Sequence, residues 1–228
     1  MTLDPSVFFV FHLYFFVSHL YFSFPIFHFP FFIFHFSFPT YNLFEKMPFI
    51  PTPIEGLMIF EPRVFGDERG YFYESYNYDT FRSAGINSVF VQDNQSRSTR
   101  NVLRGLHYQV GSFAQAKLVR VMEGEVMDVV VDIREGSPTY GQSFSLLLTA
   151  ENKKQLYIPR GFAHGFTVLS DVAEFFYKCD NFYSKESEGS IAFDDPALGI
   201  DWGINLADAI LSEKDKVHPN MGEHRRFY

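Results

Sequence analysis

The nine residues Glu125–Ile133, EVMDVVVDI, indicate a β-strand, because apolar side chains recur at every second position from Met127 to Ile133. The opposite face of this strand carries Asp128 and Asp132 together with two valines. Two carboxylates among valines indicate a strand that lines a cavity, with Asp128 facing it, although an exposed face would give the same pattern. We expect both carboxylates to have structural roles.

Outward from this strand, short apolar or alternating runs recur through the chain and are separated by turn-forming pairs such as Glu123-Gly124. Many short strands at this spacing predict a sandwich or barrel of antiparallel strands and not a parallel α/β sheet. We expect one short helix near 79–84, ended by Gly85. The expected strands are 57–60, 71–77, 88–95, 102–109, 116–122, 125–133, 142–149, 155–159, 163–169, 173–179 and 190–193.

Charge and cysteine content narrow the class of protein. The 228 residues carry a formal net charge of −8, which argues against a nucleic-acid-binding surface or an anionic-membrane binder. The single cysteine, Cys179, excludes an intramolecular disulfide and favours a reducing compartment, so we expect a cytoplasmic protein.

Residues 1–46 differ from the rest of the chain. They hold 15 of the 30 phenylalanines and 4 of the 8 histidines, with no charged residue from Pro5 to Phe44. The segment has no basic start or small-residue cleavage site, as a signal peptide would, and its prolines are unfavourable for a membrane helix. We interpret 1–46 as a low-complexity extension, either a non-native start or disordered, and 47–228 as the functional domain.

The stretch LRGLHYQ, Leu103–Gln109, poses a question about His107, which could be a metal ligand, a proton-transfer base or a packing residue. Metal-binding cupin barrels carry two motifs, and the second, Pro-x-Gly-x-x-His, is present as PRGFAH, Pro159–His164. The first motif needs a histidine two residues after His107, where this chain has Gln109. A site with at most two imidazoles and no carboxylate binds metal poorly, so we predict no metal.

Several longer runs, in order and at matching spacing from Ile54 to Asp215, resemble the dTDP-4-dehydrorhamnose 3,5-epimerase family. The resemblance implies an all-β fold, a cupin-type double-stranded jelly roll with a few short helices, that needs no cofactor. It also implies a homodimer whose N-terminal strands contribute across the interface. The runs are FGDERGYFYESYN, FVQDNQSRS, NVLRGLHYQ, AQAKLVRV, VMDVVVDIR, LYIPRGFAHGF, EFFYKCDNFYS, SEGSIAFDDPALGIDW and SEKD.

The resemblance further implies a reaction and its residues. Family members invert C3 and C5 of dTDP-4-dehydro-6-deoxy-D-glucose, giving dTDP-4-dehydro-L-rhamnose for dTDP-L-rhamnose biosynthesis. His107 matches the base, Asp215 the carboxylate that orients it, Tyr177 the acid on the opposite face, and Lys117 the cation beside the enolate. Without the resemblance, Tyr177 would be interpreted as a core aromatic and Lys117 as a strand-end cation that snorkels or reaches into a pocket.

Binding residues are implied in the same way. They comprise cations for the diphosphate, a ring that stacks on thymine, and polar contacts to nucleotide and sugar. Arg104 and His107 would face opposite sides of a regular strand, so placing both in one pocket predicts a bulge or kink at Gly105. The implied binding residues are Arg69, Glu74, Gln92, Asp93, Asn94, Arg104, His164, Tyr183, Glu188 and Lys214.

Three alternatives stay open at this point. The chain could be a related epimerase that acts at one carbon or on another nucleotide sugar, since His107, Tyr177 and Lys117 do not determine which carbon reacts. It could be a sugar-nucleotide-binding cupin without activity, or a metal-dependent dioxygenase. His218 and His224, in the polar tail, carry no hypothesis.

Overall fold

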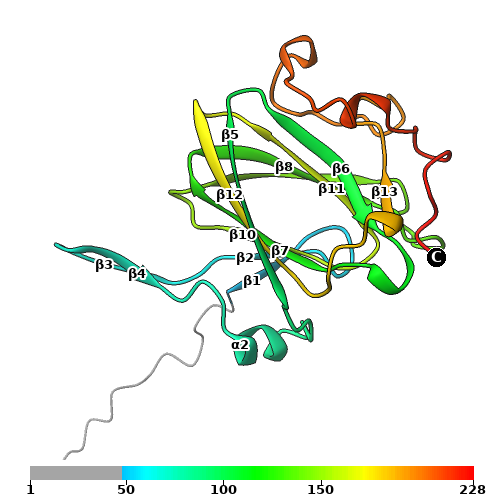
Figure 1. The fold of residues 1–228 in the computed structure, drawn as a ribbon. Coiled ribbons are helices and arrows are strands. Elements are labelled where there is room, and N and C mark those ends of the chain that lie inside the picture. Colours follow the sequence, from blue (N-terminus) through cyan, green and yellow to red (C-terminus); the bar gives the residue numbers. More distant parts are fainter. Residues whose placement is uncertain (1–47) are drawn as a thin grey trace, which may run out of the picture. The chain divides into compact units, whose positions relative to one another are not determined.

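The computed structural model describes residues 48–228, so the prediction for residues 1–46 lies outside the described part of the chain. The described residues fall in one structural unit made mainly of antiparallel strands in two large sheets (Figure 1). None of the helices in residues 48–228 has the length and apolar content that a membrane span requires.

The two large sheets have six and five strands. In spatial order, the six-stranded sheet contains β1 (Phe49–Pro51), β2 (Met58–Phe60), β10 (Gln155–Ile158), β7 (Lys117–Glu123), β12 (Val172–Cys179) and β5 (Gln92–Thr99). The five-stranded sheet contains β13 (Glu188–Ser190), β6 (Leu103–Gln109), β11 (Phe162–Val168), β8 (Glu125–Asp132) and β9 (Ser143–Thr149).

Strand pairing defines the fold as a jelly roll. The hairpin β8–β9 is innermost in sequence, and around it β7 pairs with β10, β6 with β11, and β5 with β12, all antiparallel. These nested pairs alternate between the sheets, so one long double strand curls over itself. The predicted all-β, cupin-type jelly roll is confirmed.

The remaining elements are small. Helix α2 (Tyr78–Ser83) begins at Asn77, whose side chain accepts hydrogen bonds from two backbone amides, and the predicted helix is confirmed. Strands β3 (Val64–Asp67) and β4 (Gly70–Tyr73) form a hairpin that extends away from the two sheets (Figure 1). The 3₁₀-helices are η2 (Gly111–Phe113), η3 (Lys185–Ser187), η4 (Leu206–Asp208) and η5 (Asp215–Val217).

The sequence predicted the positions of most strands to within a few residues, but it misplaced one strand and missed two others. The prediction of a strand at 88–95 was wrong in its first half, because β5 begins only at Gln92. Strands β1 and β3 were not predicted, since each is short and β3 is exposed along its whole length.

Strand β8 is buried on both faces. The sequence left open that the face with Asp128 and Asp132 is exposed to solvent, and it is not. Val126 and Val130 pack in the core between the sheets, while Val129 and Val131 pack in a second core with Trp202 of the C-terminal tail. The tail therefore covers the outer face of the five-stranded sheet.

The predicted irregularity at Gly105 is present in β6. His107 pairs with His164 and Arg104 with Phe166, so two residues of β6 oppose the single residue Gly165 of β11. Gly105 has φ = +140°, and its peptide bond to Leu106 is cis. A Cβ on Gly105 would lie 2.5 Å from the Cα of Gly165, so two backbones meet where neither can carry a side chain.

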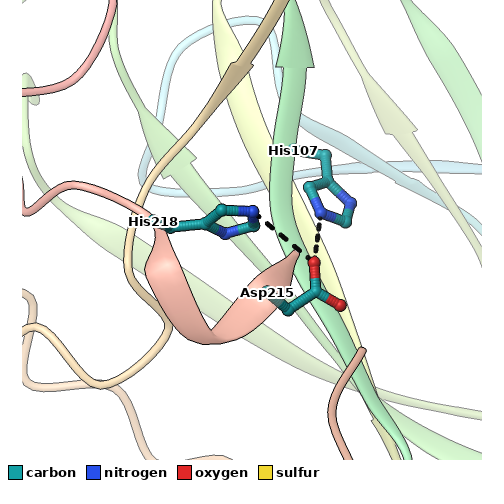
Figure 2. A group of neighbouring side chains, drawn as sticks. All are labelled: His107, Asp215 and His218. Atoms are coloured by element: carbon teal, nitrogen blue, oxygen red, sulfur yellow. Dashed lines mark hydrogen bonds and ion pairs between the residues drawn. The ribbon is translucent and has the colours of Figure 1, made fainter. Parts of the chain in front are cut away.

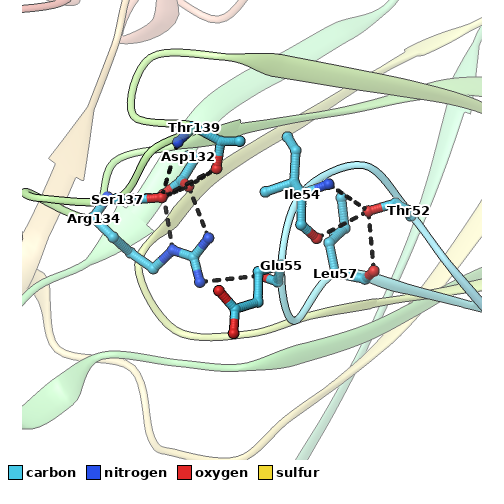
Figure 3. A network of polar contacts seen from close by, with 8 residues as sticks. All are labelled: Thr52, Ile54, Glu55, Leu57, Asp132, Arg134, Ser137 and Thr139. Atoms are coloured by element: carbon cyan, nitrogen blue, oxygen red, sulfur yellow. Dashed lines mark hydrogen bonds and ion pairs between the residues drawn. The ribbon is translucent and has the colours of Figure 1, made fainter.

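Asp132, at the end of β8, is structural as expected (Figure 3). Arg134 donates to both carboxylate oxygens, from Nε at 2.9 Å and from Nη2 at 2.7 Å, and the hydroxyls of Ser137 and Thr139 each donate at 2.7 Å. Arg134 also donates to the carbonyl of Glu55, which ties the β1–β2 loop to the β8–β9 connection. Burial works to raise the pKa of Asp132, but these hydrogen bonds outweigh it and lower the pKa to about 2.

Asp132→Asn is expected to lower the free energy of unfolding by about 2 to 3 kcal/mol at pH 7. A carboxylate with a lowered folded-state pKa contributes stability above its unfolded pKa near 4, and that stability is lost as pH falls towards 2. Denaturant unfolding at pH 7 and pH 3 measures this, with the exposed Asp208→Asn as control. A difference between wild type and Asp132→Asn that stayed constant with pH would contradict the assignment.

Gly105→Ala is expected to destabilise the protein by more than about 2 kcal/mol, because the new Cβ meets the Gly165 backbone and the positive φ disfavours alanine. Gly66→Ala is the matched control, since its nearest atom is an ordinary 3.7 Å away, and we expect a change within about 0.5 kcal/mol. Urea unfolding compares the two. Equal stability of both variants would show that the close approach is not required.

Candidate active site

A cavity of about 370 Å³ receives side chains from both sheets and from the C-terminal tail. A second space of about 250 Å³ shares five lining residues with it, so the two adjoin. The first cavity is lined by eight of the predicted site residues, Asn94, Arg104, His107, Lys117, His164, Tyr177, Lys214 and Asp215. The second adds Gln92, Tyr183 and Glu188.

His107 and Asp215 form a hydrogen-bonded pair (Figure 2). Nε2 of His107 lies 2.7 Å from Oδ1 of Asp215, although the residues are 108 positions apart. His107 comes from β6 and Asp215 from η5, where its backbone amide donates to the hydroxyl of Ser212. Burial works to raise the pKa of Asp215, but the hydrogen bonds from His107 and Ser212 hold the pKa below its usual range. An anionic carboxylate therefore faces the imidazole.

His218 lies beside this pair, a position that the sequence did not predict. Its Nε2 is 3.6 Å from Oδ1 of Asp215, and its ring meets the His107 ring edge-on at 5.2 Å between centroids. Asp215 is the first residue of η5 and His218, three residues later, is its C-cap, and both side chains lie beside His107 (Figure 2). The Asp-x-x-His spacing in the sequence indicates that Asp215 and His218 are neighbours, but it does not indicate that they lie beside His107.

A second histidine–aspartate pair lies between β11 and β8. Nε2 of His164 is 2.9 Å from Oδ2 of Asp128, and His164 lines the cavity while Asp128 is fully buried behind it. Asp128 thus points towards the cavity as expected but does not line it. Burial lowers the pKa of His164, whereas Asp128 acts in the opposite direction.

Tyr177 and Lys117 lie next to each other on neighbouring strands. Tyr177 lies on the inward face of β12, together with Phe175 and Cys179. On the neighbouring strand β7, Lys117 is the pairing partner of Cys179. The Nζ atom of Lys117 lies 5.8 Å from the centre of the Tyr177 ring. Burial raises the pKa of Tyr177 and lowers the pKa of Lys117.

Arg104 reaches the same cavity as His107 because of the bulge at Gly105. Its Nε and Nη2 both donate to the hydroxyl of Ser98, at 3.2 and 3.1 Å. The guanidinium remains exposed to solvent, with donors left for an incoming anion.

The second space combines an exposed ring with an ion pair. Tyr183 is 54% exposed, and Nζ of Lys214 lies 2.7 Å from both carboxylate oxygens of Glu188. Burial works to raise the pKa of Glu188, but the hydrogen bond from Lys214 outweighs it and lowers the pKa. Gln92 donates to Asn94 at 3.0 Å along the inward face of β5.

Three predicted binding residues lie outside both spaces. Asp93 is on the outward face of β5, where Lys178 donates to it at 2.9 Å. Arg69 is in the β3–β4 turn and pairs with Asp67. Glu74 is exposed and accepts a hydrogen bond from Asn77. Side chains alternate between the two faces of a strand, so the sequence could have indicated that Asp93 points away from the face that carries Gln92 and Asn94.

The arrangement can move protons at carbon. One imidazole has its Nε2 engaged by a carboxylate, which leaves Nδ1 to accept a proton. A phenol and an ammonium group line the same cavity and can donate to developing negative charge. A guanidinium and a second lysine at its rim suit a phosphorylated ligand.

Comparisons with known proteins agree with this chemistry. The sequence model of the dTDP-4-dehydrorhamnose 3,5-epimerase family matches residues 51–223. The chain is 56% identical over 175 residues to the dTDP-4-dehydrorhamnose 3,5-epimerase of Salmonella typhimurium, covering 76% of this chain and 95% of that protein.

Solved structures of related epimerases are similar to this chain in both fold and sequence. The crystal structure of dTDP-4-dehydrorhamnose 3,5-epimerase from Elizabethkingia anophelis has a TM-score of 0.75 and 57% identity, covering 79% of this chain and 98% of that one. The crystal structure of dTDP-6-deoxy-D-glucose-3,5-epimerase from Legionella pneumophila, in complex with dTDP-4-keto-L-rhamnose, has a TM-score of 0.74 and 52% identity, covering 77% of this chain and 93% of that one. The chain belongs to the dTDP-4-dehydrorhamnose 3,5-epimerase family.

Proposed function

We propose that this protein inverts C3 and C5 of dTDP-4-dehydro-6-deoxy-D-glucose to give dTDP-4-dehydro-L-rhamnose, a step of dTDP-L-rhamnose biosynthesis. The observation that carries the proposal is the His107–Asp215 pair in one cavity with Tyr177 and Lys117, in a chain of this family. The Legionella relative is described in complex with dTDP-4-keto-L-rhamnose, which supports a dTDP-linked keto sugar as substrate.

The chemistry follows from the C4 ketone. C3 and C5 are both α to the carbonyl, so removal of either proton places the electron pair in an enolate, and reprotonation from the opposite face inverts the carbon. The ketone is itself the electron sink, and the reaction as proposed needs no cofactor. It does need a base on one face, an acid on the other and a cation or donor near the enolate oxygen.

His107 is the proposed base. Asp215 accepts a hydrogen bond from Nε2–H, which fixes the tautomer and leaves the Nδ1 lone pair free to take the proton. The nearby carboxylate also stabilises the imidazolium that forms. Asp215 is thus a positioning residue as well as an electrostatic partner.

Tyr177 is the proposed acid and Lys117 the proposed enolate ligand. Burial raises the pKa of Tyr177, so the phenol stays protonated and ready to donate. Lys117 is placed beside it on the cavity wall and makes no ion pair with any carboxylate of residues 48–228, which leaves its ammonium group available to the substrate.

Substrate binding is assigned to the rest of the lining. Arg104 and Lys214 bind the diphosphate, Tyr183 stacks on thymine, and Gln92, Asn94, His164 and Glu188 contact sugar or nucleotide. Asp93 lies on the outward face of β5, so a substrate contact would require its carboxylate to leave Lys178.

We also propose a homodimer in which the β3–β4 hairpin reaches a second copy. Three of its aromatic side chains are largely exposed: Phe65 is 50%, Tyr71 62% and Phe72 71% exposed. An interface with a second copy would bury these rings away from water. Arg69 and Glu74 lie outside their own chain's cavity, so a role in binding requires the second copy's cavity. A cytoplasmic location is supported by the single free, buried cysteine.

Incubation with dTDP-4-dehydro-6-deoxy-D-glucose in D₂O tests the reaction. NMR is expected to show deuterium at both C3 and C5. His107→Ala is expected to lower the exchange rate by about 10²- to 10⁴-fold. In Tyr177→Phe, exchange should persist, because His107 equilibrates with solvent and returns a deuteron to the same face, while inversion should be lost.

The outcomes are distinct. Deuterium at one carbon only would identify a single-site epimerase, and binding without exchange would identify a sugar-nucleotide-binding protein without activity. His224→Ala is the control, since His224 is a buried tail histidine outside the cavity lining. Full exchange in His107→Ala would remove His107 as the base.

Phe72→Asp is expected to convert the dimer to a monomer, because a carboxylate buried against apolar rings is strongly unfavourable. Sedimentation velocity measures the mass of wild type and variant, with Leu147→Asp, on the exposed side of β9, as the control. A monomeric wild-type protein would contradict the dimer.

A further inference from the structure

His218 is a buried imidazole with no assigned role. Its side chain is 4% exposed, and neither ring nitrogen makes a hydrogen bond of normal geometry within residues 48–228, the backbone of Ile191 being a weak partner at most. Leaving buried polar atoms unpaired costs free energy, so such a group signals either strain or a missing ligand. The carboxylate of Asp215 lies 3.6 Å from Nε2 of His218 (Figure 2).

Three donor atoms converge at this point. His107, Asp215 and His218 each offer one ligand atom, all within 4.8 Å of one another. Oδ1 of Asp215 is 2.7 Å from Nε2 of His107 and 3.6 Å from Nε2 of His218. Zinc bonds of about 2.0 to 2.2 Å in tetrahedral geometry separate ligand atoms by roughly 3.4 Å, between these two distances.

We propose that His107, Asp215 and His218 bind a divalent transition-metal ion of the Zn²⁺ type, and that the bound ion inhibits the enzyme. Two imidazoles and a carboxylate form a common three-ligand set, with a fourth position left for water or a substrate oxygen. That fourth position can open to the cavity, which His107 and Asp215 line.

The inhibition follows from the atom that the metal takes. A metal on Nε2 of His107 displaces the proton from that nitrogen to Nδ1, the nitrogen proposed to accept the substrate proton. The ring stays neutral, but its basic lone pair is now bound to the metal. Asp215 would at the same time exchange its hydrogen bond to His107 for a metal bond.

The surrounding charge limits the affinity but does not exclude a cation. Lys214 and Lys117 line the same cavity and oppose a divalent ion. Lys214 is neutralised by two contacts to Glu188, and Asp215 supplies a negative charge directly at the site. The site also differs from the one that cupin motifs suggest, since it uses neither Gln109 nor His164.

Calorimetric titration of the full chain with Zn²⁺ in the absence of substrate tests binding directly. His218→Gln is expected to weaken the affinity at this site on the order of 100-fold, because even groups behind metal ligands change affinity about 10- to 100-fold. His224→Gln is the matched control from the same tail and should bind like wild type. Co²⁺ absorption provides a second readout, with ligand-field bands that His218→Gln loses.

Thermal unfolding without metal shows whether each variant is folded. If His218→Gln does not fold, His218→Ala replaces it in the binding experiments. Equal Zn²⁺ affinity and equal Co²⁺ spectra for wild type and a folded His218 variant would overturn the site. Loss of binding in the His218 variant with retention in His224→Gln would support it.

The inhibitory part rests on the proposed function and has its own test. Zn²⁺ at saturating concentration is expected to stop deuterium exchange in wild type, EDTA to restore it, and the remaining exchange of His218→Gln to resist the same Zn²⁺ concentration. Equal inhibition of both proteins would overturn the inhibitory mechanism. Binding at the site without inhibition would leave the metal site intact and contradict His107 as the base.

Discussion

The close approach of Gly105 and Gly165 is the constraint on which the site depends. A Cβ on either glycine would meet the backbone of the opposing strand, at 2.5 Å for Gly105 and 2.6 Å for Gly165. Because β6 carries one extra residue there, Arg104 and His107 both reach the cavity although they are three residues apart. The same register sets His164 opposite His107, so one backbone irregularity places three functional side chains.

Charge pairing organises the cavity that results. His107 faces Asp215, His164 faces Asp128, and Lys214 faces Glu188, so most ionisable groups have a fixed partner. Fixed partners hold side chains in one orientation and reduce the reorganisation that a reaction requires. Lys117 differs, since its ammonium group lies over the face of the Tyr177 ring, and burial lowers its pKa.

The jelly roll and the bulge at Gly105 were expected from the family resemblance, which assigns Arg104 and His107 to one pocket. Sequence patterns alone predicted a sandwich or barrel and helix α2, because alternation and a terminating glycine are local signals. They did not predict that both faces of β8 are buried, since the cover comes from Trp202, about 70 positions later. Asp93 was grouped with Gln92 and Asn94 although a strand sends it outward. His218 had no hypothesis, because the proximity of η5 to β6 is a tertiary contact.

The tail that covers the five-stranded sheet also carries Asp215, and this has a consequence for biosynthesis. Every strand of the two sheets, from β1 to β13, precedes η5 in the chain. A chain leaving the ribosome therefore exposes its strands before it exposes the carboxylate partner of His107. The two sheets would then meet before the proton-transfer pair is complete, and the tail would add both the last wall of the cavity and the catalytic carboxylate when it docks on the five-stranded sheet.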